Sequence, residues 1–387
     1  MTRIVVTGGS GKAGRAVVRD LLEQGHDVLN VDRVPSAESS GPDSPAPFLP
    51  ADLTDFGQTL EALSGGMRLP GLDAVVHLAA IPSPVHATPD VVFRANITST
   101  HTVFAAAVRL ALDRVVWASS ETTLGLPFDR PPDYAPIDER HELRPESSYV
   151  LSKVLGEEMA RQFSRWSGIP FVGLRFSNIM ERADYERFPS FWDDPHLRKW
   201  NLWSYVDASH VAQSVRLALE ADVRGAEALI IAAADTVMRT LSRQLMARCS
   251  MACRSRPTWP STAPCSVSTR RADCWGTRPT SPGGSWTYDA GRRRRGESCR
   301  VARRRGANRC GSPRVGWRGQ HRRPVGPRRD GHGPGGCRFN RPRLAEARGC
   351  GGSSTPMVSP AAAEAEPGWV GHGQLRQALT PGPSPHA

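Results

Sequence analysis

The stretch Ile4-Val5-Val6-Thr7-Gly8-Gly9-Ser10-Gly11-Lys12-Ala13-Gly14 decides how this chain folds. Its apolar start predicts a strand, and the apolar positions that follow at helical intervals, as far as Leu22, predict a helix. A strand, a glycine turn and a helix in this order form a phosphate cradle, because the backbone can approach a pyrophosphate and the helix N-terminus offers free N–H groups. A glycine turn kept for packing alone is the alternative. The residues that we predict to hold a phosphate are Gly8, Gly11, Lys12, Ala13 and Gly14.

The charge of the whole chain conceals two different parts. Its 387 residues carry a formal net charge of +12, which would favour a nucleic-acid partner. Residues 1–240, however, hold 23 Lys and Arg against 31 Asp and Glu, a net charge of −8, whereas the remainder holds 27 against 7, a net charge of +20. The basic character therefore belongs to the tail, and we expect no nucleic-acid partner.

Residues 1–240 have the composition of a cytosolic globular domain. They contain no cysteine, so no disulfide framework is expected. The first strand begins directly after residues 1–3, which leaves no room for a signal peptide. No apolar run approaches the roughly 20 residues that span a bilayer. We expect a cytoplasmic protein without a membrane partner.

Strand and helix patterns alternate along this first part of the chain. This alternation predicts an α/β fold, a Rossmann-type doubly wound parallel sheet, with ligands bound beyond the carboxyl ends of its strands. After the first strand and helix, strands are predicted over 27–32, 51–53, 74–80, 114–118, 170–175 and 228–231, and helices over 91–112, 147–166 and 207–220.

The second predicted strand ends in a carboxylate. Asp32 lies 18 residues beyond Gly14, close to where a ribose-binding acid belongs. Such a carboxylate accepts hydrogen bonds from the ribose hydroxyls and repels a 2′-phosphate, so it favours NAD over NADP. Arg33 follows directly and weakens that preference, so NADP is not excluded. An acid at a strand end that contacts only water is the alternative.

Tyr149 and Lys153 stand four residues apart on a predicted helix, hence one turn apart on the same face. A nearby ammonium favours the phenolate, so this spacing predicts a lowered tyrosine pKa and proton exchange with an alcohol or carbonyl. Ser120, at the end of another predicted strand, is placed to hold the substrate oxygen. The same pair is also common on solvated helices that have no chemical role.

In their order along the chain, these motifs resemble an extended short-chain dehydrogenase/reductase of the NAD-dependent epimerase/dehydratase group. The resemblance covers residues 1 to about 245. It implies that Ser120 orients the substrate oxygen, that Tyr149 is the acid/base, and that Lys153 lowers its pKa and binds the nicotinamide ribose. A homodimer is compatible with it. Besides the glycine turn, Asp32 and Arg33, it implies cofactor contacts from Asp52, Leu53, Leu78, Ala79, Ala80 and Asn96.

Departures from the family pattern narrow the chemistry. Dehydratases of the group resemble Thr-Asp-Glu where this chain has Ser120-Glu121-Thr122, so loss of the second acid disfavours elimination of water. Glu121 either contacts substrate or is a solvated loop acid, and Thr122 and Asn178 are further candidates for substrate contact. The segment 179–206 is short and aromatic, similar to uronate dehydrogenases, although its aromatic residues are equally compatible with an ordinary core.

We therefore predict an NAD-dependent oxidoreductase that transfers a hydride at a hydroxyl or carbonyl of a small sugar or sugar acid. A nucleotide-sugar epimerase that uses NAD catalytically is one alternative. A non-catalytic NAD-binding regulator is another, against which the presence of Ser120, Tyr149 and Lys153 argues.

The remaining residues, 246–387, have the composition of a low-complexity basic tail. From Leu241 onward only 12 of 147 residues are Leu, Ile, Val or Phe, about 8%, below the level at which chains tend to fold. The cysteines from Cys249 to Cys350 lack paired C-x-x-C spacing, so no metal site is predicted. We expect this tail to be disordered.

A shift of reading frame in a GC-rich gene explains the composition of the tail. Such a shift enriches Arg, Pro, Gly and Ala at the expense of Lys, Ile, Phe and Tyr. Taking the last base of each codon with the first two of the next, residues 272–277 must read x-Leu-Leu-Gly followed by Tyr, His, Asn or Asp. An Asp-x-x-Arg-x-Leu-Leu-Gly-Tyr run resembles the C-terminal segment of the same family. We hypothesise a single-base insertion or deletion near codons 246–249.

Overall fold

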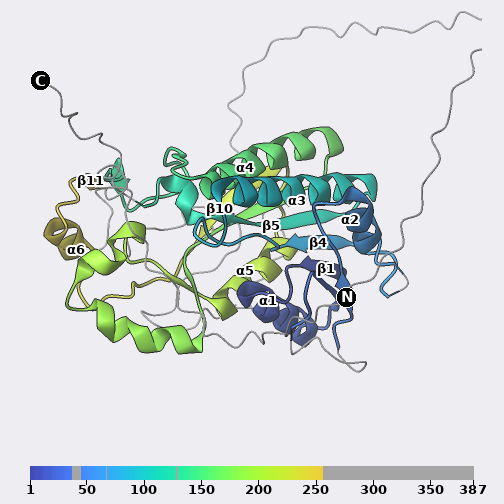
Figure 1. The fold of residues 1–387 in the computed structure, drawn as a ribbon, viewed down its shortest axis with the longest axis horizontal. Helices are drawn as coiled ribbons and strands as arrows, with labels where there is room; N and C mark the ends of the chain where they lie inside the picture. Colours follow the sequence, from blue (N-terminus) through green and yellow to red (C-terminus); the bar gives the residue numbers. More distant parts are fainter. Residues whose placement is uncertain (37–44, 67, 128–129, 256–387) are drawn as a thin grey trace, which may run out of the picture. The chain divides into compact units, whose positions relative to one another are not determined.

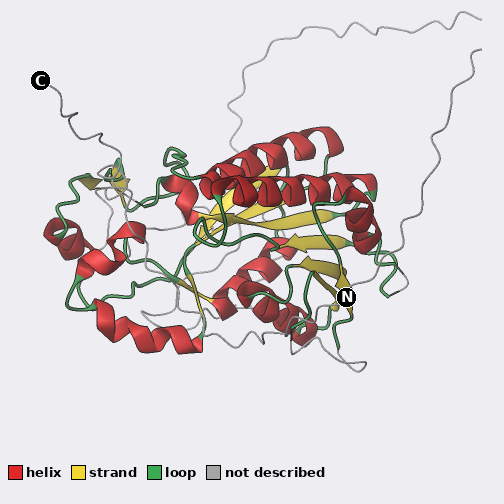
Figure 2. Ribbon diagram, in the orientation of Figure 1, coloured by secondary structure: helices red, strands yellow, loops and turns green. Residues whose placement is uncertain are grey.

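The computed structural model describes residues 1–36, 45–66, 68–127 and 130–255. Its centre is a seven-stranded parallel sheet (Figures 1 and 2), as predicted. The strands are β1 (Arg3–Thr7), β2 (Asp27–Asp32), β3 (Phe48–Pro50), β4 (Ala74–His77), β5 (Arg114–Ser120), β7 (Phe171–Phe176) and β10 (Ala226–Ile231). Their order is β10-β7-β5-β4-β1-β2-β3, so the direction of winding reverses between β1 and β4. A crevice for a ligand is expected at that reversal.

Helices cover both faces of the sheet, as Figure 1 shows. On one face lie α1 (Lys12–Glu23) and α5 (Ala208–Glu220); on the other lie α2 (Phe56–Leu63), α3 (Pro89–Arg109) and α4 (Ser148–Ser167). The apolar start of the chain supplies both cores, because Ile4 and Val6 face α1 and α5 whereas Val5 faces the opposite way. A parallel sheet buried on both sides needs such continuous apolar strands.

Local capping explains where the helices begin. Ser147 precedes α4 and its side chain accepts a hydrogen bond from the backbone N–H of Val150 at 3.3 Å. Asp207 caps α5, since its side chain accepts a hydrogen bond from the backbone N–H of Ser209 at 2.8 Å. Side-chain caps of this kind satisfy donors that the first helical turn leaves free.

Two strand predictions were wrong at their ends. The predicted strand 51–53 does not form, because β3 ends at Pro50 and the chain turns there toward α2, whose N-terminus is capped by Asp55. The predicted strand 74–80 ends at His77. The backbone N–H of Leu78 still donates to Thr7 O at 2.9 Å, but the residues after it form a loop at the carboxyl edge.

Short elements form a third region beyond the carboxyl ends of the strands. The pair β8 (Ile179–Met180) and β9 (Val206–Asp207) and the pair β6 (Tyr134–Ala135) and β11 (Arg254–Ser255) are both parallel. Their apolar cluster includes the buried residues Leu124, Ile137, Trp203, Leu245 and Met246. The other elements there are η2 (Glu121–Leu124), η3 (Arg182–Phe191), η4 (Pro195–Asn201) and α6 (Ser242–Arg248).

The indole of Trp117 in β5 fills the space between the sheet and α4. A Cβ atom added to Gly156 of α4 would lie 3.1 Å from the indole, and one added to Gly173 of β7 would also lie 3.1 Å from it. Trp117 is only 1% exposed. The two glycines therefore make room for this one large side chain.

The predicted basic tail, residues 246–387, lies outside the described residues from residue 256 onward. Residues 246–255 are described, and Met246, Cys249 and Met251 are buried in the same apolar cluster as Leu245. The boundary at residue 245 and the origin of the tail in a frameshift remain predictions. Among the described residues, no helix is both long enough and apolar enough to cross a bilayer.

Candidate active site

The glycine turn lies at the reversal of winding, between the ends of β1 and β4. Gly8 adopts a φ of +74°, and a Cβ atom there would lie 2.5 Å from the backbone nitrogen of Ala79. A Cβ on Gly14 would lie 2.1 Å from Gly8 O, whereas one on Gly11 would meet its nearest neighbour, Gly8 O, at an ordinary 3.4 Å. Packing therefore explains Gly8 and Gly14 but not Gly11. Free space at Gly11, beside the N-terminus of α1, suits a bound pyrophosphate.

The predicted adenosine-side residues gather at the ends of β2 and β3. Asp32 accepts hydrogen bonds from the backbone N–H groups of Ser10 at 3.2 Å and Arg33 at 2.7 Å, so its carboxylate adjoins the glycine turn. The pKa of Asp52 is lowered chiefly by hydrogen bonds from Thr54, with a smaller contribution from the charge of Arg33. These three predicted residues thus share one corner of the sheet. Leu53 is buried beside them.

The loop after β4 is held by a side chain from α3. Asn96 is buried, accepts from the backbone N–H of Ile81 at 2.8 Å and donates to Ile81 O at 3.0 Å. It therefore fixes the segment in which Leu78, Ala79 and Ala80 pass the glycine turn. The predicted contact of Asn96 with a cofactor remains a prediction.

Lys12 has a partner that the sequence pattern did not indicate. Its Nζ lies 2.9 Å from Asp184 Oδ2, and Arg15 of the same helix pairs with Glu181 at 2.9 Å. Both acids belong to η3 or its N-cap, so two ion pairs connect this segment to the first turns of α1. The predicted contact of Lys12 with a cofactor remains a prediction.

Ser120 and Tyr149 meet beyond the end of β5. Both are buried, and a hydrogen bond with the Ser120 side chain lowers the pKa of Tyr149. Thr122 donates to Ser120 Oγ from its hydroxyl at 2.8 Å and from its backbone N–H at 3.2 Å. Thr122, predicted as a substrate contact, is thus placed to orient Ser120.

The pKa of Tyr149 differs from the prediction based on helical spacing. Burial raises it to about 12, which outweighs the hydrogen bond from Ser120. The Nζ of Lys153 lies 5.8 Å from the centre of the tyrosine ring and donates to Ala118 O at 2.9 Å. The lowered pKa expected from Lys153 was therefore wrong for the chain without ligand, because both groups are desolvated. Burial also lowers the pKa of Lys153 to about 8.

Glu121 is a buried acid with several hydrogen-bond donors around it, so it is not a solvated loop acid. It is 4% exposed, and its Oε2 accepts from Ser177 Oγ at 2.6 Å. Asn201 Nδ2 reaches Oε1 at 3.4 Å, and the backbone N–H of Asn178 is a further donor. Ser177 and Asn201 were not predicted as part of the site. No local pattern could have shown them, since they reach Glu121 from separate segments of the chain.

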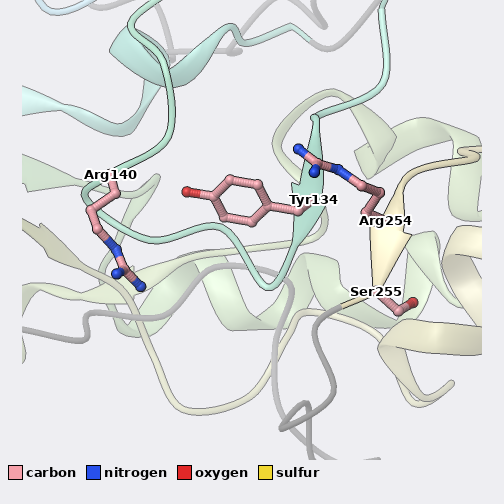
Figure 3. Close-up of a pocket in the computed structure, with 4 residues that line it drawn as sticks. All are labelled: Tyr134, Arg140, Arg254 and Ser255. Atoms are coloured by element: carbon pink, nitrogen blue, oxygen red, sulfur yellow. The ribbon is translucent and has the colours of Figure 1, made fainter.

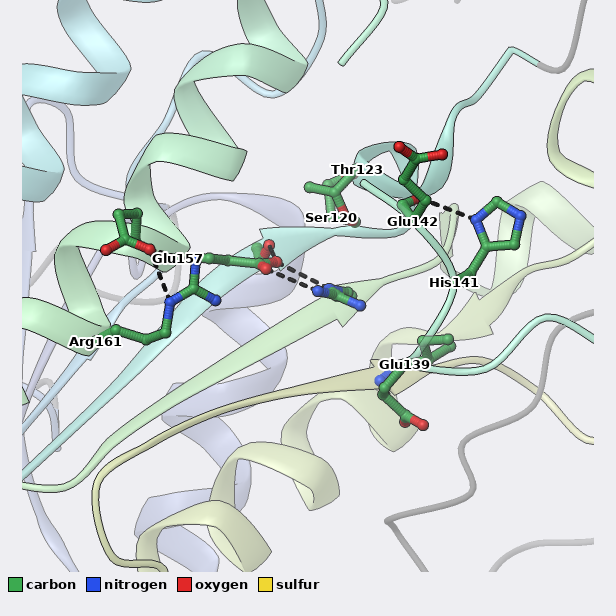
Figure 4. Close-up of polar contacts among 11 residues, drawn as sticks. Ser120, Thr123, Glu139, His141, Glu142, Glu157 and Arg161 are labelled. Carbon is green, nitrogen blue, oxygen red and sulfur yellow. Dashed lines mark hydrogen bonds and ion pairs between the residues drawn. The ribbon is translucent and has the colours of Figure 1, made fainter. Parts of the chain in front are cut away.

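A buried ion pair lies between α4 and the sheet, beside Ser119 of β5 (Figure 4). Glu157 of α4 accepts from Arg175 of β7 at 2.9 and 2.7 Å, and from Ser119 Oγ at 2.7 Å. The Glu157 and Arg175 side chains are 2% and 5% exposed. Glu157 thus connects α4 to two strands of the sheet, β5 and β7.

A cavity of about 510 Å³ is lined by Tyr134, Arg140, Arg254 and Ser255 (Figure 3). None of the predicted catalytic side chains lines it. It lies where β6 meets β11, so it does not belong to the site formed by Ser120 and Tyr149.

Comparison with known proteins places this geometry in a family. The pattern of the NAD dependent epimerase/dehydratase family matches residues 4–191. NAD-dependent glucose-6-phosphate dehydrogenase of Haloferax volcanii is 30% identical over 221 residues, which cover 54% of this chain and 78% of that enzyme. The chain belongs to the NAD-dependent epimerase/dehydratase family. The resemblance read from its motifs is thus confirmed.

Members of the family with different activities resemble this chain. Uronate dehydrogenase of Pseudomonas putida is 29% identical over 191 residues, which cover 49% of this chain and 66% of that enzyme. The chain spans about half the length, 49% to 57%, of several UDP-glucose 4-epimerases that it matches, one of them described as putative. A solved short-chain dehydrogenase/reductase superfamily protein from Agrobacterium tumefaciens with bound NAD shares the fold, with a TM-score of 0.54 and 24% identity over 71% of this chain and 91% of its own.

Proposed function

We propose that this family member is an NAD-dependent dehydrogenase that oxidises a hydroxyl group of a small sugar or sugar acid, or reduces the corresponding carbonyl. The observation that carries the proposal is the meeting of Ser120 and Tyr149, with Lys153 one helical turn away, at the same edge of the sheet as the glycine turn. NAD, when bound, supplies a hydride acceptor at its nicotinamide ring. The free space at Gly11 and the carboxylate of Asp32 beside Ser10 fit its pyrophosphate and ribose.

Ser120, Tyr149 and Lys153 have different roles in proton transfer. Ser120, oriented by Thr122, holds the substrate oxygen. Tyr149 exchanges a proton with that oxygen, and its pKa of about 12 favours the neutral phenol that donates to a carbonyl. In the direction of oxidation, the Lys153 ammonium stabilises the phenolate electrostatically. With a pKa of about 8, this ammonium is mostly protonated at neutral pH.

The size of the substrate side supports a small sugar. Between Asn178 and Asp207 the chain forms only short elements. Their aromatic side chains belong to the apolar cluster: Trp203 and Tyr205 are buried in it, and Phe188 and Trp200 pack against it. These aromatic residues are therefore core.

Turnover of NAD tests the proposal. The full chain is incubated with NAD and a panel of aldoses, sugar phosphates and sugar acids, and NADH is followed by its near-ultraviolet absorbance. We expect NADH to accumulate with at least one member. Tyr149→Phe should lower the rate at least on the order of 10²-fold, because the proton acceptor is lost. Unchanged turnover in this variant would exclude Tyr149 as the acid/base.

The epimerase alternative predicts a different result in the same assay. An epimerase returns the hydride, so a UDP-sugar would be converted to its epimer without net NADH. A non-catalytic regulator would bind NAD and turn over neither class of sugar. The two outcomes are separated by chromatography of the sugars after incubation.

A further inference from the structure

The walls of the site contain a buried acid with a role beyond the three catalytic side chains. Glu121 begins η2, directly after Ser120, and is hydrogen-bonded by two segments that are distant from it in sequence. Ser177 follows β7, and Asn201 ends η4. Ser177 Oγ also lies 2.9 Å from Ser204 Oγ, and Asn201 Nδ2 donates to Ser204 O at 2.8 Å. One carboxylate thus joins the catalytic strand to the substrate-side segment.

The donors around Glu121 match its ionised form. Ser177 Oγ, Asn201 Nδ2 and the backbone N–H of Asn178 all donate to it, and an ionised carboxylate is an acceptor only. A protonated carboxyl group must itself donate, so one of these contacts has to rearrange. The arrangement of the wall therefore depends on the charge of Glu121.

Two other charged or titratable groups face Glu121 among the described residues. Arg198 of η4 exerts a favourable charge on the carboxylate, and Tyr149 of α4 feels the negative charge of Glu121, which raises the tyrosine pKa. Burial dominates and raises the pKa of Glu121 to about 7. Its two forms are thus both accessible near neutral pH.

We propose that Glu121 is a positioning residue, which holds Ser177, Asn178 and Asn201 as one wall of the sugar site beside Ser120 and Tyr149, and does so in its ionised form. The inference rests on the proposed function, because it assigns this wall to the sugar rather than to NAD. Sugar binding should weaken as the pH falls through the titration of Glu121, while NAD binding should not.

The test uses the full chain and the sugar that the NADH assay identifies. For the wild type, KM for the sugar should rise as pH falls below neutrality, with KM for NAD unchanged. Glu121→Gln mimics the uncharged form. We expect its KM for the sugar to be on the order of tenfold higher, equivalent to one lost hydrogen bond, and to be independent of pH near neutrality. Its KM for NAD should equal that of the wild type.

Two further variants separate position from charge. Ser177→Ala removes the shortest contact but keeps the carboxylate, so KM should rise while the pH dependence persists. Glu158→Gln removes an exposed acid of α4 and should change neither quantity. If Glu121→Gln had the sugar KM and the pH profile of the wild type, the inference would be overturned, whereas the proposed function would stand.

Unfolding provides a readout that needs no substrate. Because the pKa of Glu121 is raised from 4.5 to about 7 in the folded chain, the folded state holds an extra proton between these values. The wild type should therefore lose stability relative to Glu121→Gln as the pH rises from 4.5 to about 7, seen as a falling denaturation midpoint. A constant difference across this range would mean that Glu121 keeps one charge state there, and it would overturn the predicted pH dependence of the KM for the sugar. If no sugar is bound or oxidised by the wild type, the proposed function fails and the inference fails with it.

Discussion

At the scale of single residues, two glycines of the turn differ in what requires them: Gly14 is required by packing, whereas Gly11 is left free for a ligand. Gly14 has no space for a methyl group, since its Cβ would lie 2.1 Å from Gly8 O and 2.5 Å from Gly9 Cα. Gly11 has a φ of −74° and only an ordinary contact at 3.4 Å. The fold alone would therefore tolerate alanine at residue 11, and a bound pyrophosphate would not.

Alanine substitutions at these two glycines should give opposite phenotypes. Gly14→Ala should lower the free energy of unfolding, although alanine in a helix normally stabilises by roughly 0.5–1 kcal/mol over glycine. Gly11→Ala should keep the stability of the wild type and weaken NAD binding on the order of tenfold or more. Thermal unfolding and calorimetric titration with NAD measure the two effects. Full NAD affinity in Gly11→Ala would leave the glycine turn with a packing role only.

A short local pattern was sufficient to select residues that the structure brings together, while their roles stay predictions. The glycine turn, Asp32, Ser120 and the Tyr149–Lys153 helix all carry such patterns, and the structure places them at one edge of the sheet. Local patterns failed where the environment decides. Helical spacing alone predicted a lowered tyrosine pKa, whereas burial raises it, and the partners of Glu121 come from the segment 177–204, which has no regular period.

At the scale of elements, one buried ion pair holds α4 to the sheet, and an exposed pair beside it lies within the helix. Glu157 and Arg175 are almost fully buried, and Arg175 belongs to β7. Glu158, the next residue, pairs with Arg161 on the same helix at about half exposure. The consecutive residues therefore provide a matched comparison.

Removal of each acid should have very different costs. Glu157→Gln leaves the buried Arg175 charge without its counter-ion and should lower the free energy of unfolding by about 3–5 kcal/mol. Glu158→Gln should change it by less than about 1 kcal/mol, because an exposed pair is screened by water. Urea denaturation of both variants measures the difference. Equal effects would mean that Glu157 does not hold α4 to the sheet.

Element boundaries were predicted less well than element types. Most strands and the long helices follow from apolar periodicity, but the predicted strand 51–53 does not form and β4 ends at His77 instead of residue 80, because loops begin there. The short α2 was not predicted, since eight residues give too few turns for a clear period.

At the scale of the whole molecule, the chain changes character close to α6. This helix spans Ser242–Arg248, and its Leu245 and Met246 are buried against Trp203 and its neighbours. The proposed change of reading frame falls at codons 246–249, inside or just after this helix. The described fold therefore extends a few residues beyond the proposed shift.

Sequencing the gene across codons 246–249 tests the frameshift. We expect a single-base insertion or deletion relative to a frame that encodes Leu-Leu-Gly opposite residues 272–277. A chain expressed from the corrected frame should unfold at a higher temperature, because the restored residues would cover the substrate side. An intact and well-covered frame would refute the hypothesis.

The packing of Trp117 between Gly156 and Gly173 limits which substitutions this protein can accept at these positions. The indole sets the distance between α4 and the sheet, and this distance determines how Tyr149 meets Ser120. A methyl group gained at residue 156 or 173 must be matched by a smaller side chain at residue 117, or the tyrosine moves away from the serine. We therefore expect residues 117, 156 and 173 to change only together. One of them lies on α4, which carries Tyr149, and none of them belongs to the site.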